Sequence, residues 1–85
     1  MPPTVLCAQG DRTLFQIHSQ ALVGDGYRVI PAHDGQQALD RFRAECPDLV
    51  VIDVLLPKRD GFDVLAAIRE MPEPAGLTPV LLLSS

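Results

Sequence analysis

The stretch that most constrains the fold is residues 47–61, PDLVVIDVLLPKRDG. Residues 49–52 form an unbroken apolar run rich in β-branched side chains, too short for a helix of its own. Such a run is typical of a parallel strand covered by helices on both faces, because neither face needs polar residues. The run ends on Asp53, and ligands and chemistry in open α/β sheets gather at the carboxyl ends of the strands. Pro57 and Gly61 then predict a loop.

The rest of the chain alternates short apolar runs with helical patterns. Strands are expected at residues 4–8, 27–30, 49–52 and 80–83, and helices between residue 12 and the Gly24–Gly26 stop, at 35–45, and from 61 to about 70. Asp11 and Asp34 are candidate N-caps of the first two helices, and Pro31 is expected to end the second strand. The third helix is expected to bury Phe62, Leu65 and Ile68. This β-α alternation predicts an α/β fold with a parallel sheet and right-handed crossovers.

Composition excludes several classes of protein. With 47% hydrophobic and 21% charged residues the chain is expected to be globular, and at 85 residues to form one small domain. The net charge of −4 argues against a nucleic-acid site or an anionic membrane surface. No apolar run is long enough to cross a membrane, and the start lacks the pattern of an export signal. Cys7 and Cys46 lack metal-ligand spacing, which predicts reduced thiols and a cytoplasmic location.

Four segments together resemble a known family over essentially the whole chain. They are GYRV at 26–29, HDGQQAL at 33–39, PDLVVIDVLLPKRDGFDVLAAIR at 47–69 and PVLLLSS at 79–85. The chain resembles the receiver domain of two-component response regulators. That resemblance implies a doubly wound, flavodoxin-like parallel sheet in the order 2-1-3-4-5. The four strands expected here would be 2-1-3-4, so 1–85 is interpreted as one receiver-like domain, incomplete at its C-terminus.

The resemblance also implies roles for individual residues. Asp53 would accept a phosphoryl group from a histidine kinase or phosphotransfer protein as an acyl phosphate, so the domain would act as a switch and not as an enzyme. Asp53 and the backbone carbonyl of Leu55 would contact Mg²⁺. Ser84 would hydrogen-bond the phosphoryl group and pass the change to a protein-interaction surface.

One departure from the family pattern bears on the metal. Receiver domains carry two acidic residues after the first strand, and here those positions are Gln9 and Gly10. Asp11, the next residue, is a weak candidate ligand and is better interpreted as a helix cap. Mg²⁺ favours charged oxygen ligands, so weak binding is predicted. Two interpretations stay open, a phosphorylated receiver and a pseudo-receiver that binds partners without phosphorylation.

Other expectations concern the surface and competing classes. Residues 80–83 would form an uncharged sheet edge, which predicts dimerisation through it or a longer natural chain. His18 and His33 are expected to be solvated. A phosphatase with an Asp nucleophile would need a second Asp where Leu55 stands. A nucleotide-binding fold would need a glycine-rich turn that residues 8–11 do not provide.

Overall fold

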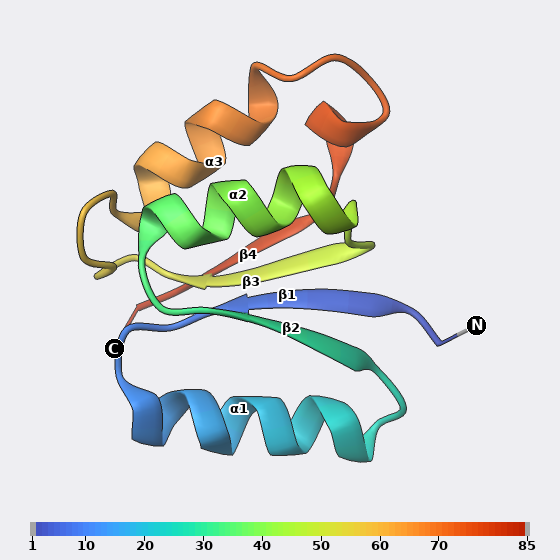
Figure 1. The fold of residues 1–85 in the computed structure, drawn as a ribbon, viewed down its shortest axis with the longest axis vertical. Helices are drawn as coiled ribbons and strands as arrows, with labels where there is room; N and C mark the ends of the chain where they lie inside the picture. The colour runs from blue at the N-terminus through green and yellow to red at the C-terminus, as the bar shows by residue number, and fades with distance from the viewer. Residues whose placement is uncertain (1, 85) are drawn as a thin grey trace.

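The computed structural model describes residues 2–84, which form a parallel four-stranded sheet in the order β2-β1-β3-β4. The elements are β1 Thr4–Ala8, α1 Arg12–Gly24, β2 Arg28–Ala32, α2 Gly35–Glu45, β3 Leu49–Asp53, α3 Gly61–Arg69, a 3-10 helix at Ala75–Leu77, and β4 Val80–Leu83. Helices α2 and α3 cover one face of the sheet and α1 lies alone on the other (Figure 1). The predicted doubly wound fold and strand order are confirmed.

The core lies between the sheet and the pair α2 and α3. It collects alternate residues of each strand, because successive side chains of a strand point to opposite faces. The buried residues of this cluster are Leu6, Ala8, Ile30, Ala32, Ala38, Leu39, Phe42, Val50, Ile52, Leu56, Val64 and Ile68. The core fixes β3 at the centre of the sheet, with β1 and β4 on either side.

Two predictions about the strands and helices are wrong. The second strand does not end before Pro31, which pairs in register with Cys7, and the strand continues to Ala32. Among the described strands β2 lies at an edge, where a missing backbone N–H is tolerated. Phe62 is not core: it is 59% exposed, and α3 buries Val64 and Ile68 instead.

The glycine that opens α3 explains why Phe62 points outward. A Cβ atom at Gly61 would lie 2.7 Å from the carbonyl oxygen of Asp53, closer than real Cβ atoms approach an oxygen. Gly61 therefore lets the start of α3 contact the end of β3 directly. With Gly61 facing the sheet, helical geometry turns Val64 and Ile68 inward and Phe62 toward solvent.

The face beneath α1 is less tightly filled. Helix α1 has no fully buried residue. A hollow of about 260 Å³ lies beside it, lined by His18, Ala21, Leu22, Val51 and Leu83. His18 is half-buried, so the prediction that it would be solvated is wrong. Its Nδ1 atom is buried without a hydrogen-bond partner among the described residues. No helix within residues 2–84 has the length and apolar character needed to cross a bilayer.

Candidate functional site at the carboxyl end of the sheet

Asp53 is the last residue of β3 and its side chain is held at the carboxyl end of the sheet. The residue is 4% exposed, and its Oδ1 atom accepts a hydrogen bond from the backbone N–H of Leu55 at 2.8 Å. A buried carboxylate needs such donors to replace lost water. Leu55 is 71% exposed, so it contacts the Asp53 carboxylate through its backbone N–H while its side chain lies in solvent. The result is a single oriented carboxylate where the central strand ends.

Gln9 directly follows β1, and its hydrogen bonds hold the loop that it begins. It is 3% exposed, and its backbone N–H donates to the Ala32 carbonyl at 3.0 Å. Its Oε1 atom accepts from the Asp11 backbone N–H at 3.2 Å. Its carbonyl oxygen lies 3.1 Å from Nδ1 of His33. His33 is half-buried, so the prediction that it would be solvated is wrong. The one side-chain oxygen that Gln9 could offer a cation is therefore already engaged.

Asp11 caps α1, as predicted. Its Oδ1 atom accepts from the backbone N–H of Leu14 at 3.0 Å, and the residue is exposed. Its neighbour Gly10 has no side chain, and a Cβ atom there would lie 3.1 Å from Cδ of Pro57. The loop after β1 thus contributes no carboxylate that is free of another task.

Ser84 follows directly after β4. Leu83 pairs in register with Asp53, so Ser84 stands one residue beyond the level of the carboxylate on the neighbouring strand. Ser84 is exposed. Asp53, Leu55 and Ser84 therefore all lie at the carboxyl ends of the neighbouring strands β3 and β4, whereas Asp11 caps α1.

The residues present do not fit the magnesium ion that receiver domains generally bind at this place. Mg²⁺ favours charged oxygen ligands in octahedral geometry. The end of β3 and the loop after it supply one carboxylate, from Asp53, and one candidate backbone carbonyl, from Leu55. Across residues 2–84 no three His, Cys, Asp or Glu side chains come together in a group able to hold a metal ion.

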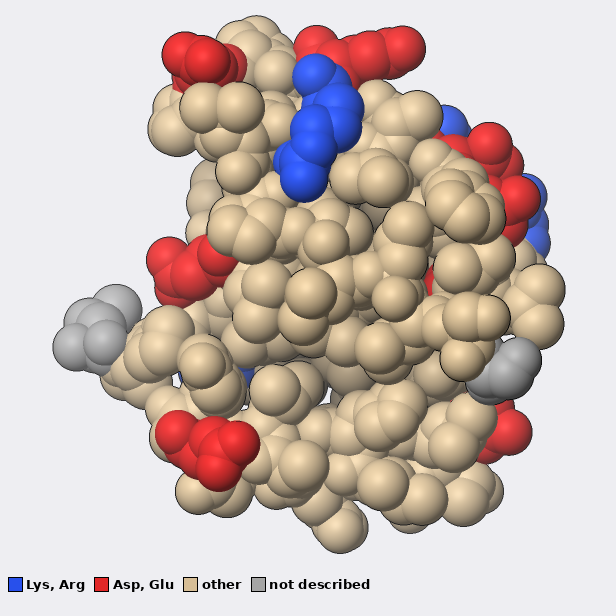
Figure 2. Space-filling view, turned by 180° about the vertical axis from the view of Figure 1, so that it is seen from behind, with Lys and Arg blue, Asp and Glu red and all other residues tan. Residues whose placement is uncertain are grey.

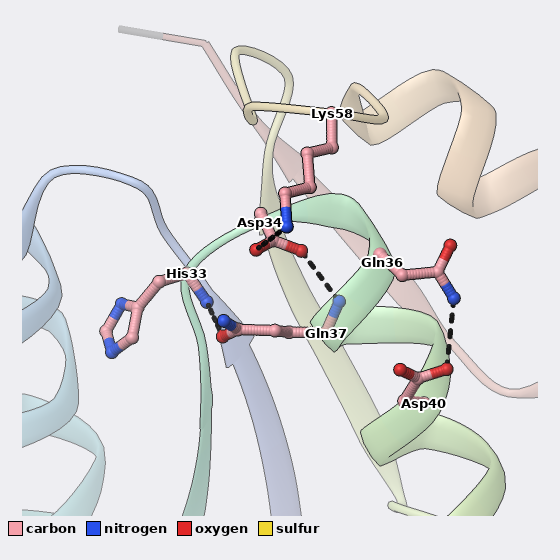
Figure 3. A network of polar contacts seen from close by, with 6 residues as sticks. All are labelled: His33, Asp34, Gln36, Gln37, Asp40 and Lys58. Atoms are coloured by element: carbon pink, nitrogen blue, oxygen red, sulfur yellow. Dashed lines mark hydrogen bonds and ion pairs between the residues drawn. The ribbon is translucent and has the colours of Figure 1, made fainter.

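A second polar network beside the site was not predicted. Asp34 caps α2, its Oδ1 atom accepting from the Gln37 backbone N–H at 2.8 Å, and Nζ of Lys58 lies 3.6 Å from its Oδ2 atom (Figure 3). Gln37 in turn accepts at Oε1 from the backbone N–H of His33 at 3.0 Å. The Gln37 hydrogen bond first, and the charge of Lys58 after it, hold the pKa of Asp34 below its ordinary value. The cap was predicted from the sequence; the ion pair was not.

The network joins the loop after β3 to the start of α2. The Gly35 backbone N–H donates to the Pro57 carbonyl at 3.1 Å, and a Cβ atom at Gly35 would collide with the Arg59 carbonyl oxygen. Lys58 adopts a left-handed backbone conformation with φ 67°, which is uncommon for a residue with a side chain. Lys58 and Asp34 are 24 positions apart, so no local pattern could have revealed their contact.

The fold and the carboxylate at the end of β3 define a receiver-like α/β domain. The family model of the response regulator receiver domain matches residues 5–85, and the chain belongs to that family. It is 38% identical over 81 residues to the transcriptional regulatory protein CpxR of Escherichia coli K12. It is 34% identical over 85 residues to the alkaline phosphatase synthesis transcriptional regulatory protein PhoP of Bacillus subtilis.

Solved structures agree with this assignment. The Francisella response regulator 1452 receiver domain superposes with a TM-score of 0.87 at 32% identity, covering 96% of this chain and 65% of that one. The chemotaxis response regulator CheY4 of Vibrio cholerae gives 0.89 at 30% identity, covering 96% and 68%. The matches to CpxR and PhoP cover 95% and 100% of this chain but only 33% and 34% of those proteins. The chain thus spans about a third of their length.

Proposed function

We propose that the domain accepts a phosphoryl group on Asp53 from a histidine kinase or phosphotransfer protein, and so switches a protein interaction in the cytoplasm. The observation that carries the proposal is the place of Asp53. It is a buried carboxylate at the carboxyl end of β3. It pairs in register with Leu83 of β4, the residue before Ser84. Parallel sheets of this type concentrate their chemistry at that edge.

The transfer makes an acyl phosphate. The free carboxylate oxygen of Asp53 attacks the phosphorus of a phosphohistidine, a P–O bond forms as the P–N bond breaks, and the imidazole leaves with the electron pair and takes up a proton. The Leu55 backbone N–H holds the other oxygen at 2.8 Å, which orients the carboxylate for attack. The Ser84 hydroxyl would then donate a hydrogen bond to a phosphoryl oxygen, linking the modification to the end of β4.

Output is proposed to pass through protein contacts. CpxR and PhoP are named as transcriptional regulatory proteins, and this chain spans about a third of each. A net charge of −4 gives the domain no basic footprint for nucleic acid. Regulation of a partner protein, or of a further domain, is therefore the proposed role of the switch.

A second candidate function rests on the loop after β1. Gln9 and Gly10 supply no charged oxygen, and the Gln9 side chain is engaged by the Asp11 backbone N–H. Phosphoryl transfer ordinarily depends on a cation to neutralise the developing charge. A pseudo-receiver, which binds partners through the same fold without phosphorylation, is the alternative that this observation favours.

Intact-protein mass spectrometry after incubation with acetyl phosphate and Mg²⁺ separates the two functions. The wild type should gain one phosphoryl group and Asp53→Asn should gain none. Asp63→Asn, an exposed carboxylate in the first turn of α3, is the matched control and should be modified like the wild type. A wild type that stays unmodified while a competent receiver domain is modified in parallel would establish the pseudo-receiver instead.

The metal account makes its own prediction. Gln9→Asp with Gly10→Asp should raise Mg²⁺ affinity roughly tenfold or more, because two charged ligands join Asp53. Isothermal titration would measure it, with Gln9→Asp alone as a control, since Gly10 faces Pro57 at 3.1 Å and its substitution needs a small shift of that ring. Wild-type affinity equal to that of the double variant would contradict this account. So would an affinity unchanged by adding Asp53→Asn to the double variant.

A further inference from the structure

The tip of the loop after β3, residues 57–59, is a tight turn in an uncommon conformation. The Arg59 backbone N–H donates to the Pro57 carbonyl at 2.7 Å, which closes a three-residue turn around Lys58. Lys58 has φ 67°, and a turn of this kind with a positive φ at its centre is the rare, strained form of the γ-turn. Glycine would adopt this conformation without that cost. A lysine in a strained position beside a candidate site is expected to have a task.

The Lys58 side chain contacts a carboxylate that is already held in place. Its Nζ atom lies 3.6 Å from Oδ2 of Asp34, and the two side chains point toward each other (Figure 3). Asp34 is 7% exposed, and its other oxygen accepts from the Gln37 backbone N–H at 2.8 Å. Salt screens a partly buried charge less than an exposed one. The start of α2 therefore offers a fixed anion to the mobile ammonium group of the loop tip.

The same short loop carries the hydrogen-bond donor of the candidate site. At its start the Leu55 backbone N–H donates to Oδ1 of Asp53 at 2.8 Å. At its tip the Pro57 carbonyl accepts from the Gly35 backbone N–H at 3.1 Å. The Pro57 ring also lies close to the loop after β1, since a Cβ atom at Gly10 would be 3.1 Å from its Cδ atom. Contacts at the tip therefore set the path that the loop takes past the carboxylate.

We propose that Lys58 is a positioning residue for phosphoryl transfer, acting through its ion pair with Asp34. The proposal rests on the transfer to Asp53 proposed above. The ion pair holds the strained turn, and the held turn keeps the Leu55 N–H on one oxygen of the Asp53 carboxylate while the other oxygen is free to attack. When the ion pair is removed, the turn relaxes and the donor is no longer fixed. The transfer then slows, because the carboxylate must be oriented during the reaction and not before it.

A second positive charge in the loop separates positioning from general attraction. The chain has 7 basic residues against 11 acidic ones, and Lys58 and Arg59 stand next to each other in this loop. Figure 2 shows the charged side chains of the rear face toward its margins, basic beside acidic where the loop after β3 and the start of α3 lie. Attraction of an anionic phosphoryl donor would use both cations alike. Positioning uses Lys58 alone, since Arg59 forms no ion pair within residues 2–84.

The rate of modification by acetyl phosphate tests the proposal. Asp53 takes the phosphoryl group as acetate leaves with the electron pair, and intact-protein mass spectrometry follows the time course. Lys58→Gln should lower the maximal rate at least about threefold, the effect of an ion pair of ordinary strength, with the half-saturating acetyl phosphate concentration unchanged. Lys58→Arg keeps the ion pair and should stay within about twofold of wild type. Arg59→Gln, the matched control, removes a neighbouring charge and should also stay within about twofold.

Two further variants separate positioning from stability. Lys58→Gly removes the ion pair and the backbone strain together, so it should melt at a higher temperature than Lys58→Gln and yet be modified equally slowly. Asp34→Asn should slow the modification as Lys58→Gln does. The double variant should be no slower than either single variant, because one interaction is lost in each. Rates that follow the melting temperatures, or losses that add in the double variant, would overturn the proposal.

Hydrogen exchange of the Leu55 amide, measured by NMR on the unmodified protein, tests the positioning itself. The exchange should be faster in Lys58→Gln than in wild type and unchanged in Arg59→Gln. Equal exchange in wild type and Lys58→Gln would overturn the inference. So would equal modification rates of these two proteins, a result that leaves the proposed function standing. A wild type that is never modified would overturn the proposed function instead, and the role of Lys58 in transfer would fall with it.

Discussion

The two faces of the sheet differ in how completely they are covered. Between the sheet and the helices α2 and α3 lies a continuous cluster of buried side chains, including Phe42, Leu39 and Ile68. On the opposite face α1 buries no residue fully, and a hollow of about 260 Å³ lies beside it. On this side of the sheet the rings of Phe15 and His33 meet edge-on, with their centroids 5.0 Å apart.

The well-packed face is therefore expected to provide most of the stability, and the other leaves apolar surface exposed. The α2 and α3 face also anchors the site, since Gly35 and Asp34 at the start of α2 hold the loop that follows Asp53. The α1 face and the β4 edge hold apolar surface that nothing within residues 2–84 covers completely. Close packing makes the first face costly to alter. The α1 face is filled less completely, so substitutions there should cost less stability.

The largest expected effect compares two phenylalanines. Phe42 is 2% exposed beneath α2, so Phe42→Ala should cost about 3–5 kcal/mol of unfolding free energy. Phe15 on α1 is half-buried, and Phe15→Ala should cost less than about 2 kcal/mol. Urea unfolding of both variants beside wild type measures the two losses. Equal losses would show that the two faces contribute alike and would break the comparison.

The next effect compares two glycines. A Cβ atom at Gly35 would meet the Arg59 carbonyl, so Gly35→Ala should cost about 1–3 kcal/mol as the loop is displaced. At Gly24, the last residue of α1, a Cβ atom meets nothing within 4 Å, and Gly24→Ala should stabilise by about 0.4–1 kcal/mol. Thermal unfolding of the pair decides it. A neutral Gly35→Ala would mean that α2 does not clamp the loop.

The smallest effect is a pH dependence at the cap of α2. The pKa of Asp34 is lowered, first by the Gln37 backbone N–H and then by Lys58, so its stabilisation is present above the unfolded value of about 3.9 and lost as the pH falls through the lowered folded value. Asp34→Asn keeps a cap but removes the charge. Its deficit relative to wild type should be full at pH 6 and shrink below about pH 4.

Unfolding free energies of both proteins at several pH values provide the measurement. Lys58→Gln retains the Gln37 hydrogen bond and should keep part of the pH dependence, since that bond lowers the pKa of Asp34 more than the charge of Lys58 does. A deficit of Asp34→Asn that stays constant from pH 6 to about pH 3 would show that the charge of Asp34 is not what stabilises the cap.

Much of this molecule was predictable because its signals are local. The helix at 35–45 and the strands at 4–8 and 80–83 have the predicted bounds. The caps Asp11 and Asp34 were predicted from their residue type and their place before a helix. Asp53 was identified as a candidate because a carboxylate ending an apolar strand is visible within a few residues. These features depend on the period of side chains along one element, which the sequence states directly.

The sequence by itself therefore determined the elements, the sheet class and the carboxylate that ends β3. Only the tertiary structure decided which side of α3 is buried, because Gly61 packs against the Asp53 carbonyl and turns Phe62 outward. It also decided that Lys58 pairs with Asp34 and that the Gln9 side chain holds its own loop. The Gly61 and Lys58 contacts join different segments, and even the short Gln9 bond depends on how its loop turns. Strand order, register and loop path fix them, and no local period in the chain records them.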